Sequence, residues 1–346
     1  MTAAPVPVTI LTGFLGSGKT TLINRLLRER AEVRFAVIEN EYGEIGVDAE
    51  LLHRERDETI VELSNGCICC TVRGDLARAL DGLARRRASC EIAFDHVLIE
   101  TTGLADPGPL VRTFLAETRL LDLYYLDGVV TLVDALNGAR ILGQSPTARS
   151  QLGYADRILV TKPDQVEPSV MEGLVERLAT MNATAEVRVV DLLGSSAGSI
   201  VDGLLDMRGY QLDRVRLPPP AVAEDRHHDA RHHEAVSSVT YRADGELNSA
   251  QFDRALGRVA DRFGQSLWRV KGIVAITGLR QRLIVQGVQG LIHTTLGTIW
   301  KPFEPRRSTL VLIGEELDRD WIVRQLQRSE AAGTPSAISL DVTHAR

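Results

Sequence analysis

The chain has no long apolar run, and this absence excludes a membrane-spanning helix. No apolar stretch approaches the roughly 20 residues that a helix needs to cross a bilayer. Residues 1–7 also lack the basic start and the apolar run of a secretory signal peptide. We therefore expect a cytoplasmic protein that has no membrane partner.

Basic residues are too few for a surface that binds nucleic acid. The chain has 40 Lys and Arg against 46 Asp and Glu, which gives a formal net charge of −6. A protein that binds nucleic acid needs a basic patch to neutralise phosphates, and the sequence has no extended one. Nucleic acid is therefore not an expected partner.

Cysteine is scarce as well, but its distribution is informative. Three of the four cysteines, Cys67, Cys69 and Cys70, fall within four positions. Such a cluster is not a secreted disulfide framework. In a reducing compartment it indicates metal binding or redox chemistry.

The strongest motif is Gly-x-x-x-x-Gly-Lys-Thr, which begins at Gly13 and ends with Gly18, Lys19 and Thr20. Its glycines let backbone N–H groups approach phosphate oxygens, Lys19 can reach the β- and γ-phosphates, and the Thr20 hydroxyl can bind Mg²⁺. An apolar strand precedes the motif and an amphipathic helix follows it. Phosphate would therefore lie at the helix N-terminus, where the dipole and the unpaired amides favour anions.

An acidic loop follows the predicted strand at residues 34–38. It carries Glu39, Glu41, Glu44 and Asp48 among glycines. This position, after the helix that follows the glycine-rich motif (the P-loop), is typical of a nucleotide-responsive switch. In such a switch an acid holds Mg²⁺ or orients the attacking water. A plain surface loop is the alternative.

The cysteine segment follows a predicted strand at residues 59–63. In an extended chain Cys67 and Cys69 face the same way, and Cys70 can supply a third sulfur if the chain turns. Thiolates suit Zn²⁺ and Cu(I), and three sulfurs leave a labile fourth position that suits a metal in transit. A catalytic or redox-sensing thiol and a buried structural cluster stay open as alternatives.

Two further strand ends carry nucleotide signals. Glu100 ends an apolar strand, as does the acid that supports Mg²⁺ in P-loop proteins, and Gly103 would lie near the γ-phosphate. The segment 161–164, Thr-Lys-Pro-Asp, follows another strand and is similar to the Asn-Lys-x-Asp motif that reads guanine. Asp164 can accept two hydrogen bonds that guanine offers and adenine cannot. Thr161 lacks the amide that braces the base and the P-loop, so we expect weaker affinity.

Strands and helices alternate from residue 6 to about residue 212, which predicts a parallel α/β sheet covered on both faces. A polar stretch with two histidine pairs follows, and it is equally consistent with a solvated linker and with metal capture. From residue 236 the β-α-β-β-β-α order predicts a small α+β domain. The 346 residues suit two domains, with expected boundaries 1–216, 217–235 for the linker, and 236–346.

Together these motifs resemble those of the CobW-type metallochaperone GTPases. The matching segments are residues 13–21, 39–44, 66–70, 100–107 and 161–164. The resemblance implies GTP hydrolysis coupled to delivery of Zn²⁺, or of Co²⁺, to a client metalloprotein. In the YjiA-like branch of the family, the resemblance implies that Glu39 and Glu44 are further zinc ligands.

The sequence thus predicts an α/β fold, with a P-loop NTPase parallel-sheet domain and a smaller α+β CobW-type C-terminal domain. Two alternatives to a GTP-hydrolysing metallochaperone stay open: a metal-sensing or buffering protein with GTP as a regulatory ligand, and a kinase that uses ATP, against which Asp164 argues. The sequence allows a homo-oligomer but does not specify the oligomeric state.

The residues expected in catalysis with Mg²⁺ are Lys19, Thr20, Asp48 and Glu100. Those expected to bind GTP are Gly13, Gly16, Ser17, Gly18, Lys19, Thr20, Thr21, Gly103, Thr161, Lys162 and Asp164. The expected transition-metal ligands are Cys67, Cys69, Cys70, Glu39 and Glu44.

Overall fold

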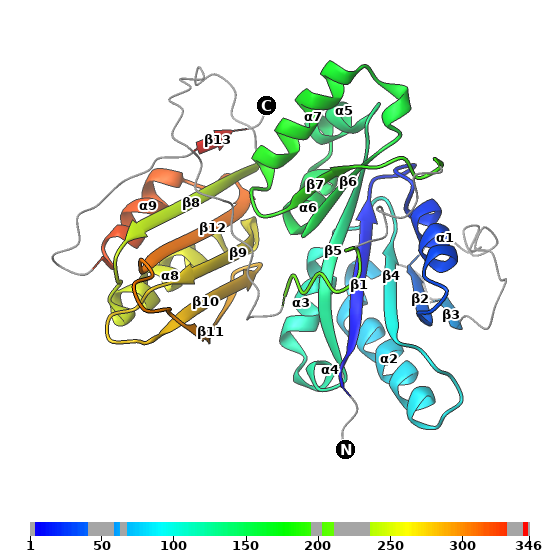
Figure 1. Ribbon diagram of the computed structural model, residues 1–346, viewed down its shortest axis with the longest axis horizontal. Coiled ribbons are helices and arrows are strands. Elements are labelled where there is room, and N and C mark those ends of the chain that lie inside the picture. The colour runs from blue at the N-terminus through cyan, green and yellow to red at the C-terminus, as the bar shows by residue number, and fades with distance from the viewer. Residues whose placement is uncertain are drawn as a thin grey trace. The chain divides into compact units, whose positions relative to one another are not determined.

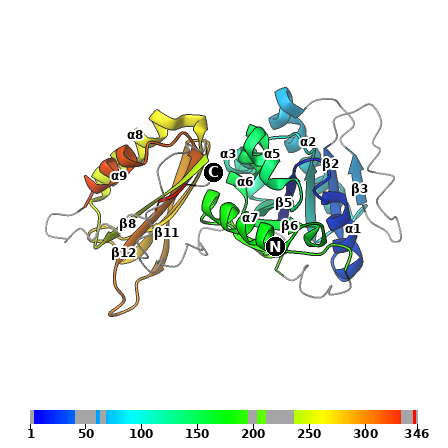
Figure 2. The same ribbon diagram turned by 90° about the horizontal axis from the view of Figure 1, so that it is seen from above.

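A computed structural model describes residues 4–40, 59–62, 68–194, 203–210, 236–330 and 342–344 (Figures 1 and 2). The chain divides into two compact units, residues 1–175 with 185–210 and residues 176–184 with 211–346. Within the described ranges, no helix has the length and apolar character that crossing a membrane requires. Glu44, Asp48, Cys67 and the linker histidines lie outside the described residues.

The first unit is built on a seven-stranded sheet in the order β3-β2-β4-β1-β5-β6-β7, and every strand pair in it is parallel. Parallel pairing requires crossover connections, which the predicted strand–helix alternation supplies. The predicted α/β class is therefore confirmed. The strands are β1 Val6–Gly13, β2 Phe35–Asn40, β3 Thr59–Glu62, β4 His96–Thr101, β5 Tyr124–Asp134, β6 Arg157–Thr161 and β7 Glu186–Val189.

Helices lie on both faces of this sheet. Helix α1 buries Leu22 and Leu26 against Leu11 and Leu132, whereas α6 receives a hydrogen bond from Thr131, the neighbour of Leu132 on β5. Successive strand residues face opposite ways, so α1 and α6 cover opposite faces. The helices are α1 Lys19–Glu29, α2 Ile68–Ala88, α3 Gly108–Ala116, α4 Thr118–Leu121, α5 Gly138–Gln144, α6 Pro146–Tyr154 and α7 Pro168–Met181, with a 3₁₀ turn, η2, at Pro163–Gln165.

The start of α2 corrects one prediction. The prediction for the cysteine segment assumes extended chain, but α2 begins at Ile68. Cys69 and Cys70 therefore lie in its first turn, where successive residues are about 100° apart around the axis. Because Cys69 is helical, the argument that it faces the same way as Cys67 in an extended chain does not hold.

The second unit is a six-stranded antiparallel sheet in the order β11-β10-β9-β12-β8-β13, with helices α8 and α9. The predicted α+β class is confirmed, although the sequence pattern missed β11 and β13. The elements are β8 Val236–Asp244, α8 Ser249–Phe263, the 3₁₀ turn η4 Gly264–Ser266, β9 Leu267–Val274, β10 Gln281–Val288, β11 Leu291–Ile299, β12 Arg307–Glu315, α9 Arg319–Gln327 and β13 Val342–His344.

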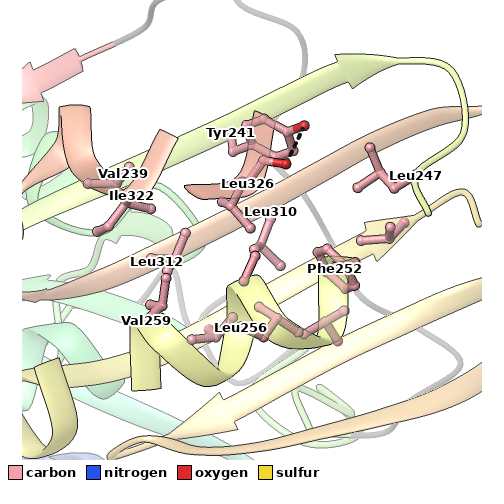
Figure 3. Close-up of a cluster of buried hydrophobic side chains, with 14 of the residues drawn as sticks. Val239, Tyr241, Leu247, Phe252, Leu256, Val259, Leu310, Leu312, Ile322 and Leu326 are labelled. Atoms are coloured by element: carbon pink, nitrogen blue, oxygen red, sulfur yellow. Dashed lines mark hydrogen bonds between the residues drawn. The ribbon is translucent and has the colours of Figure 1, made fainter. Parts of the chain in front are cut away.

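The core of the second unit forms between its helices and one face of its sheet (Figure 3). Phe252 and Val259 from α8 are buried with Ile322 from α9, and all three belong to the same cluster as Leu310 and Leu312 of β12. Side-chain caps fix both helix starts, because Asn248 accepts a hydrogen bond from the Gln251 amide and Asp318 accepts one from the Trp321 amide.

Candidate functional site

The P-loop joins β1 to α1 and leaves the start of α1 open. Gly18 has a left-handed backbone with φ of 99°, which glycine adopts without steric cost, and α1 begins at the next residue. Among the residues that the structure describes, no side chain caps the α1 N-terminus. An 11-residue helix therefore presents uncapped amides and the positive end of its dipole at the point where the motif predicts phosphate.

Lys19 is buried over the same loop. Its ammonium donates to the carbonyl oxygens of Gly13 at 2.9 Å and Phe14 at 3.4 Å. The Ser17 hydroxyl is also buried, and within the described part of the chain it has no hydrogen-bond partner. A preplaced cation and an unused hydroxyl in one glycine-rich loop fit a phosphate ligand.

Thr20 and Glu100 meet at the end of β4. The Thr20 hydroxyl donates to the Glu100 carboxylate at 3.3 Å, and only 7% of Glu100 is exposed. On the neighbouring strand β2, Glu39 is the register partner of Glu100. A hydroxyl and a carboxylate beside a phosphate loop are the oxygen ligands that Mg²⁺ favours, so these residues fit that ion.

The loop after β4 packs directly on the P-loop. A Cβ atom at Gly103 would lie 2.5 Å from the backbone nitrogen of Leu15, so only glycine fits there without movement. The Gln151 side-chain amide on α6 donates to the carbonyls of Gly103 at 3.2 Å and Ala105 at 3.0 Å. The sequence gives no signal for Gln151, because one glutamine on a helix face has no motif.

Thr161 corrects an expectation about the guanine motif. The sequence predicts that threonine loses the brace between this motif and the P-loop. The Thr161 hydroxyl, however, donates to the Ser17 carbonyl at 2.8 Å and is also 3.3 Å from the Val133 carbonyl. The brace to the P-loop is therefore present and made by a hydroxyl. Asp164 is exposed in η2, where a base could approach it.

Asp134, at the end of β5, fixes the lysine of this motif. Lys162 has a left-handed backbone with φ of 56°, and its ammonium is 2.7 Å from the Asp134 carboxylate. Burial works to raise the pKa of Asp134, but Lys162 and the amides of Asn137 and Leu136 together hold it below its usual value. Asp134 is not among the predicted site residues, although an acid directly after the apolar run 128–133 was the available signal.

The expected transition-metal ligands are only partly placed. Of Cys69, Cys70 and Glu39 the structure gives the backbone position alone, and Glu44 and Cys67 are outside it. Among the described residues, no group of three or more His, Cys, Asp or Glu side chains is arranged to hold a metal ion. In the backbone, α2, which carries Cys69 and Cys70, begins six residues after the end of β3. Strand β3 is in turn the neighbour of β2, which carries Glu39.

Comparisons with known proteins agree with this architecture. Residues 7–189 match the family model described as "CobW/HypB/UreG, nucleotide-binding domain", and residues 236–330 match "Cobalamin synthesis protein cobW C-terminal domain". The zinc chaperone YjiA of Escherichia coli is 39% identical over 92% of this chain and 96% of its own length. The zinc chaperone CobW of Pseudomonas aeruginosa is 32% identical over 95% of this chain and 93% of its own.

A solved structure extends the likeness to three dimensions. The crystal structure of the Zn(II)-bound YjiA GTPase from E. coli covers 95% of this chain and 100% of its own, with a TM-score of 0.78 at 32% identity. Both domains and most of the sequence therefore align with one kind of protein. The chain belongs to the CobW/HypB/UreG family of nucleotide-binding proteins and carries the CobW-type C-terminal domain.

Proposed function

We propose that this protein is a GTP-hydrolysing metallochaperone that carries a divalent transition metal to a client metalloprotein. Zinc is the proposed cargo, because relatives that align over nearly the whole chain are named zinc chaperones. Cobalt is the alternative cargo. Cys67, Cys69 and Cys70 are the proposed ligands, with Glu39 from the end of β2 and Glu44 from the segment after it.

One observation carries the proposal. Strands β3, β2, β4 and β1 are adjacent and parallel, so their carboxyl ends meet at one edge of the sheet. The cysteine segment follows β3, the acidic loop follows β2, the Gly103 loop follows β4 and the P-loop follows β1. A metal held by the first two segments would therefore lie beside segments that contact the nucleotide's phosphates.

The residues at this edge suit phosphoryl transfer. Lys19 and the α1 amides would stabilise charge on the β- and γ-phosphate oxygens, and Gly103 would contact the γ-phosphate. Thr20 and Glu100, with Asp48 from the acidic loop, would hold Mg²⁺, which neutralises charge between those oxygens when bound. Lys162, Thr161 and Asp164 would bind the guanine base. No arginine is placed by a motif to act on the γ-phosphate, so we expect slow turnover without a partner.

The test is GTP turnover with and without added metal. Steady-state hydrolysis should change when Zn²⁺ is added to the wild-type protein. The triple variant Cys67→Ser, Cys69→Ser, Cys70→Ser should bind GTP normally but lose that response. Cys90→Ser is the matched control, because Cys90 is exposed and lies beyond the end of α2.

Two results would redirect the proposal. If hydrolysis is the same with and without Zn²⁺ while the metal still binds the cysteines, the protein is a metal buffer with GTP as a passive ligand. If ATP competes with GTP at equal concentration, Asp164 does not select guanine. Adding Co²⁺ and Ni²⁺ separately to the same GTP turnover assay identifies the preferred metal cargo.

A further inference from the structure

A buried glutamine joins the segments proposed to contact the γ-phosphate. Gln151 on α6 is 1% exposed, and its side-chain nitrogen donates to two carbonyls of the loop after β4, those of Gly103 and Ala105. Gln151 and the P-loop residue Phe14 also line the same small cavity. One side-chain amide therefore lies where the P-loop and the Gly103 loop come together.

Helix α6 is a firm support for this contact. The Thr131 hydroxyl on β5 donates to the Gln151 backbone carbonyl at 2.7 Å, which ties α6 to the strand beside β1. The preceding residue, Ser150, donates to the Asp106 carboxylate at 2.7 Å, and Asp106 accepts from the Gly108 amide at 2.9 Å. The loop from Gly103 to Asp106 is thus held at both ends by adjacent residues of one helix.

We propose that Gln151 is a positioning residue that sets the Gly103 loop for recognition of the γ-phosphate, and so helps the protein to distinguish GTP from GDP. The inference rests on the proposed function, because it takes GTP as the ligand. A primary amide suits the role, since its two N–H groups satisfy two carbonyls at once. Because a side chain at Gly103 would overlap Leu15, the loop lies directly against the P-loop, and Gln151 and Ser150 hold it there from α6.

The experiment compares the affinity for GTPγS with that for GDP, both with Mg²⁺, by competition against a fluorescent guanine nucleotide. Gln151→Met removes both donors and keeps a similar volume. The Kd for GTPγS should rise about tenfold, since two hydrogen bonds are lost, while the Kd for GDP changes less than twofold. The kcat for GTP hydrolysis should also fall in this variant. Gln144→Met is the control, because Gln144 is exposed at the end of α5.

The outcomes distinguish a positioning role of Gln151 from a purely structural one. A structural role alone would lower the melting temperature and leave the ratio of the two Kd values at the wild-type figure, and that result would overturn the inference. Ser150→Ala provides a second test if Gln151→Met does not fold, and it should shift the ratio in the same direction by a smaller factor. An unchanged ratio there also overturns the inference. If the wild-type protein binds no GTPγS, the proposed function fails instead.

Discussion

The Thr161 hydroxyl lies 2.8 Å from the Ser17 carbonyl and connects the guanine motif to the P-loop across 144 residues of sequence. Both residues are buried, with 1% of each exposed. The segments that we propose to bind the base and the phosphates are therefore joined by a direct contact. Asparagine is the commoner residue at this position of the motif, but a hydroxyl serves to hold the P-loop.

We predict that Thr161→Val weakens this coupling. Valine keeps the shape but leaves the Ser17 carbonyl without its donor, so the free energy of unfolding should fall by about 1 kcal/mol. Affinity for GDP and GTP should fall together, because the P-loop loses its support for both. Thr161→Ser keeps the hydroxyl and should behave like the wild type in calorimetric titrations; a similar loss in both variants would contradict the explanation.

Asp134→Asn tests the ion pair that holds Lys162. Without the charged partner, the lysine should lose its fixed position, and KM for GTP should rise about tenfold, as expected for a hydrogen bond to a charged group. The kcat should stay near the wild-type value, because the Asp134 carboxylate bonds to Lys162 and to the amides of Leu136 and Asn137. Asp95→Asn breaks an exposed pair with Arg34 before β4 and should leave KM unchanged.

Glu100→Gln tests the proposed Mg²⁺ site. The amide keeps its contact distance to Thr20 but loses the charge, so the Mg²⁺ concentration for half-maximal hydrolysis should rise about 10–100-fold. GDP binding without Mg²⁺ should be unaffected. Glu91→Gln, at an exposed acid paired with Arg86, is the matched control. A normal Mg²⁺ requirement in Glu100→Gln would remove Glu100 from the proposed site.

His96 gives a prediction on pH. Burial lowers the pKa of His96 to about 4, and the ring is 2.8 Å from the Thr9 hydroxyl beside it on β1. His96 takes up a proton near pH 6.5 in the unfolded chain but only near pH 4 in the folded protein. Stability is therefore full above pH 6.5 and falls by about 3 kcal/mol between pH 6.5 and 4.

Chemical denaturation at several pH values measures this loss. His96→Gln cannot titrate and should show a shallower fall over the same range. The slope in that variant reports other groups, including Asp127: burial raises its pKa, so its protonation favours the folded state as the pH falls and opposes the loss. Identical slopes in the two proteins would show that His96 does not contribute.

The sequence predicts the first unit well because its signals are local. The P-loop, the strand before it and the helix after it occupy one continuous stretch, and Gly13, Glu100 and Asp134 lie at the ends of apolar strands. The edge strand β11 was missed for a physical reason. It is largely exposed and mixes threonine with apolar residues, so it has no clear alternation.

The supporting residues of the site could not be predicted in the same way. Gln151 acts on a carbonyl 48 positions earlier in the chain, and Asp134 acts on a lysine 28 positions later. A single glutamine has no motif, and the acid after the apolar run of β5 indicates a site without indicating its partner Lys162. Nucleotide motifs are thus visible in the sequence, whereas the contacts that hold them in place are visible only in the fold.

If the metal site lies beside the nucleotide's phosphates, as we propose, nucleotide state should change the affinity of the cysteine segment for a metal. The most direct test is the Zn²⁺ affinity of the wild-type protein, measured by competition with a chelating dye, once with a GTP analogue and once with GDP. Coupling of ordinary strength predicts that the two Kd values differ at least about fivefold. Equal Kd values in the two nucleotide states would contradict the account.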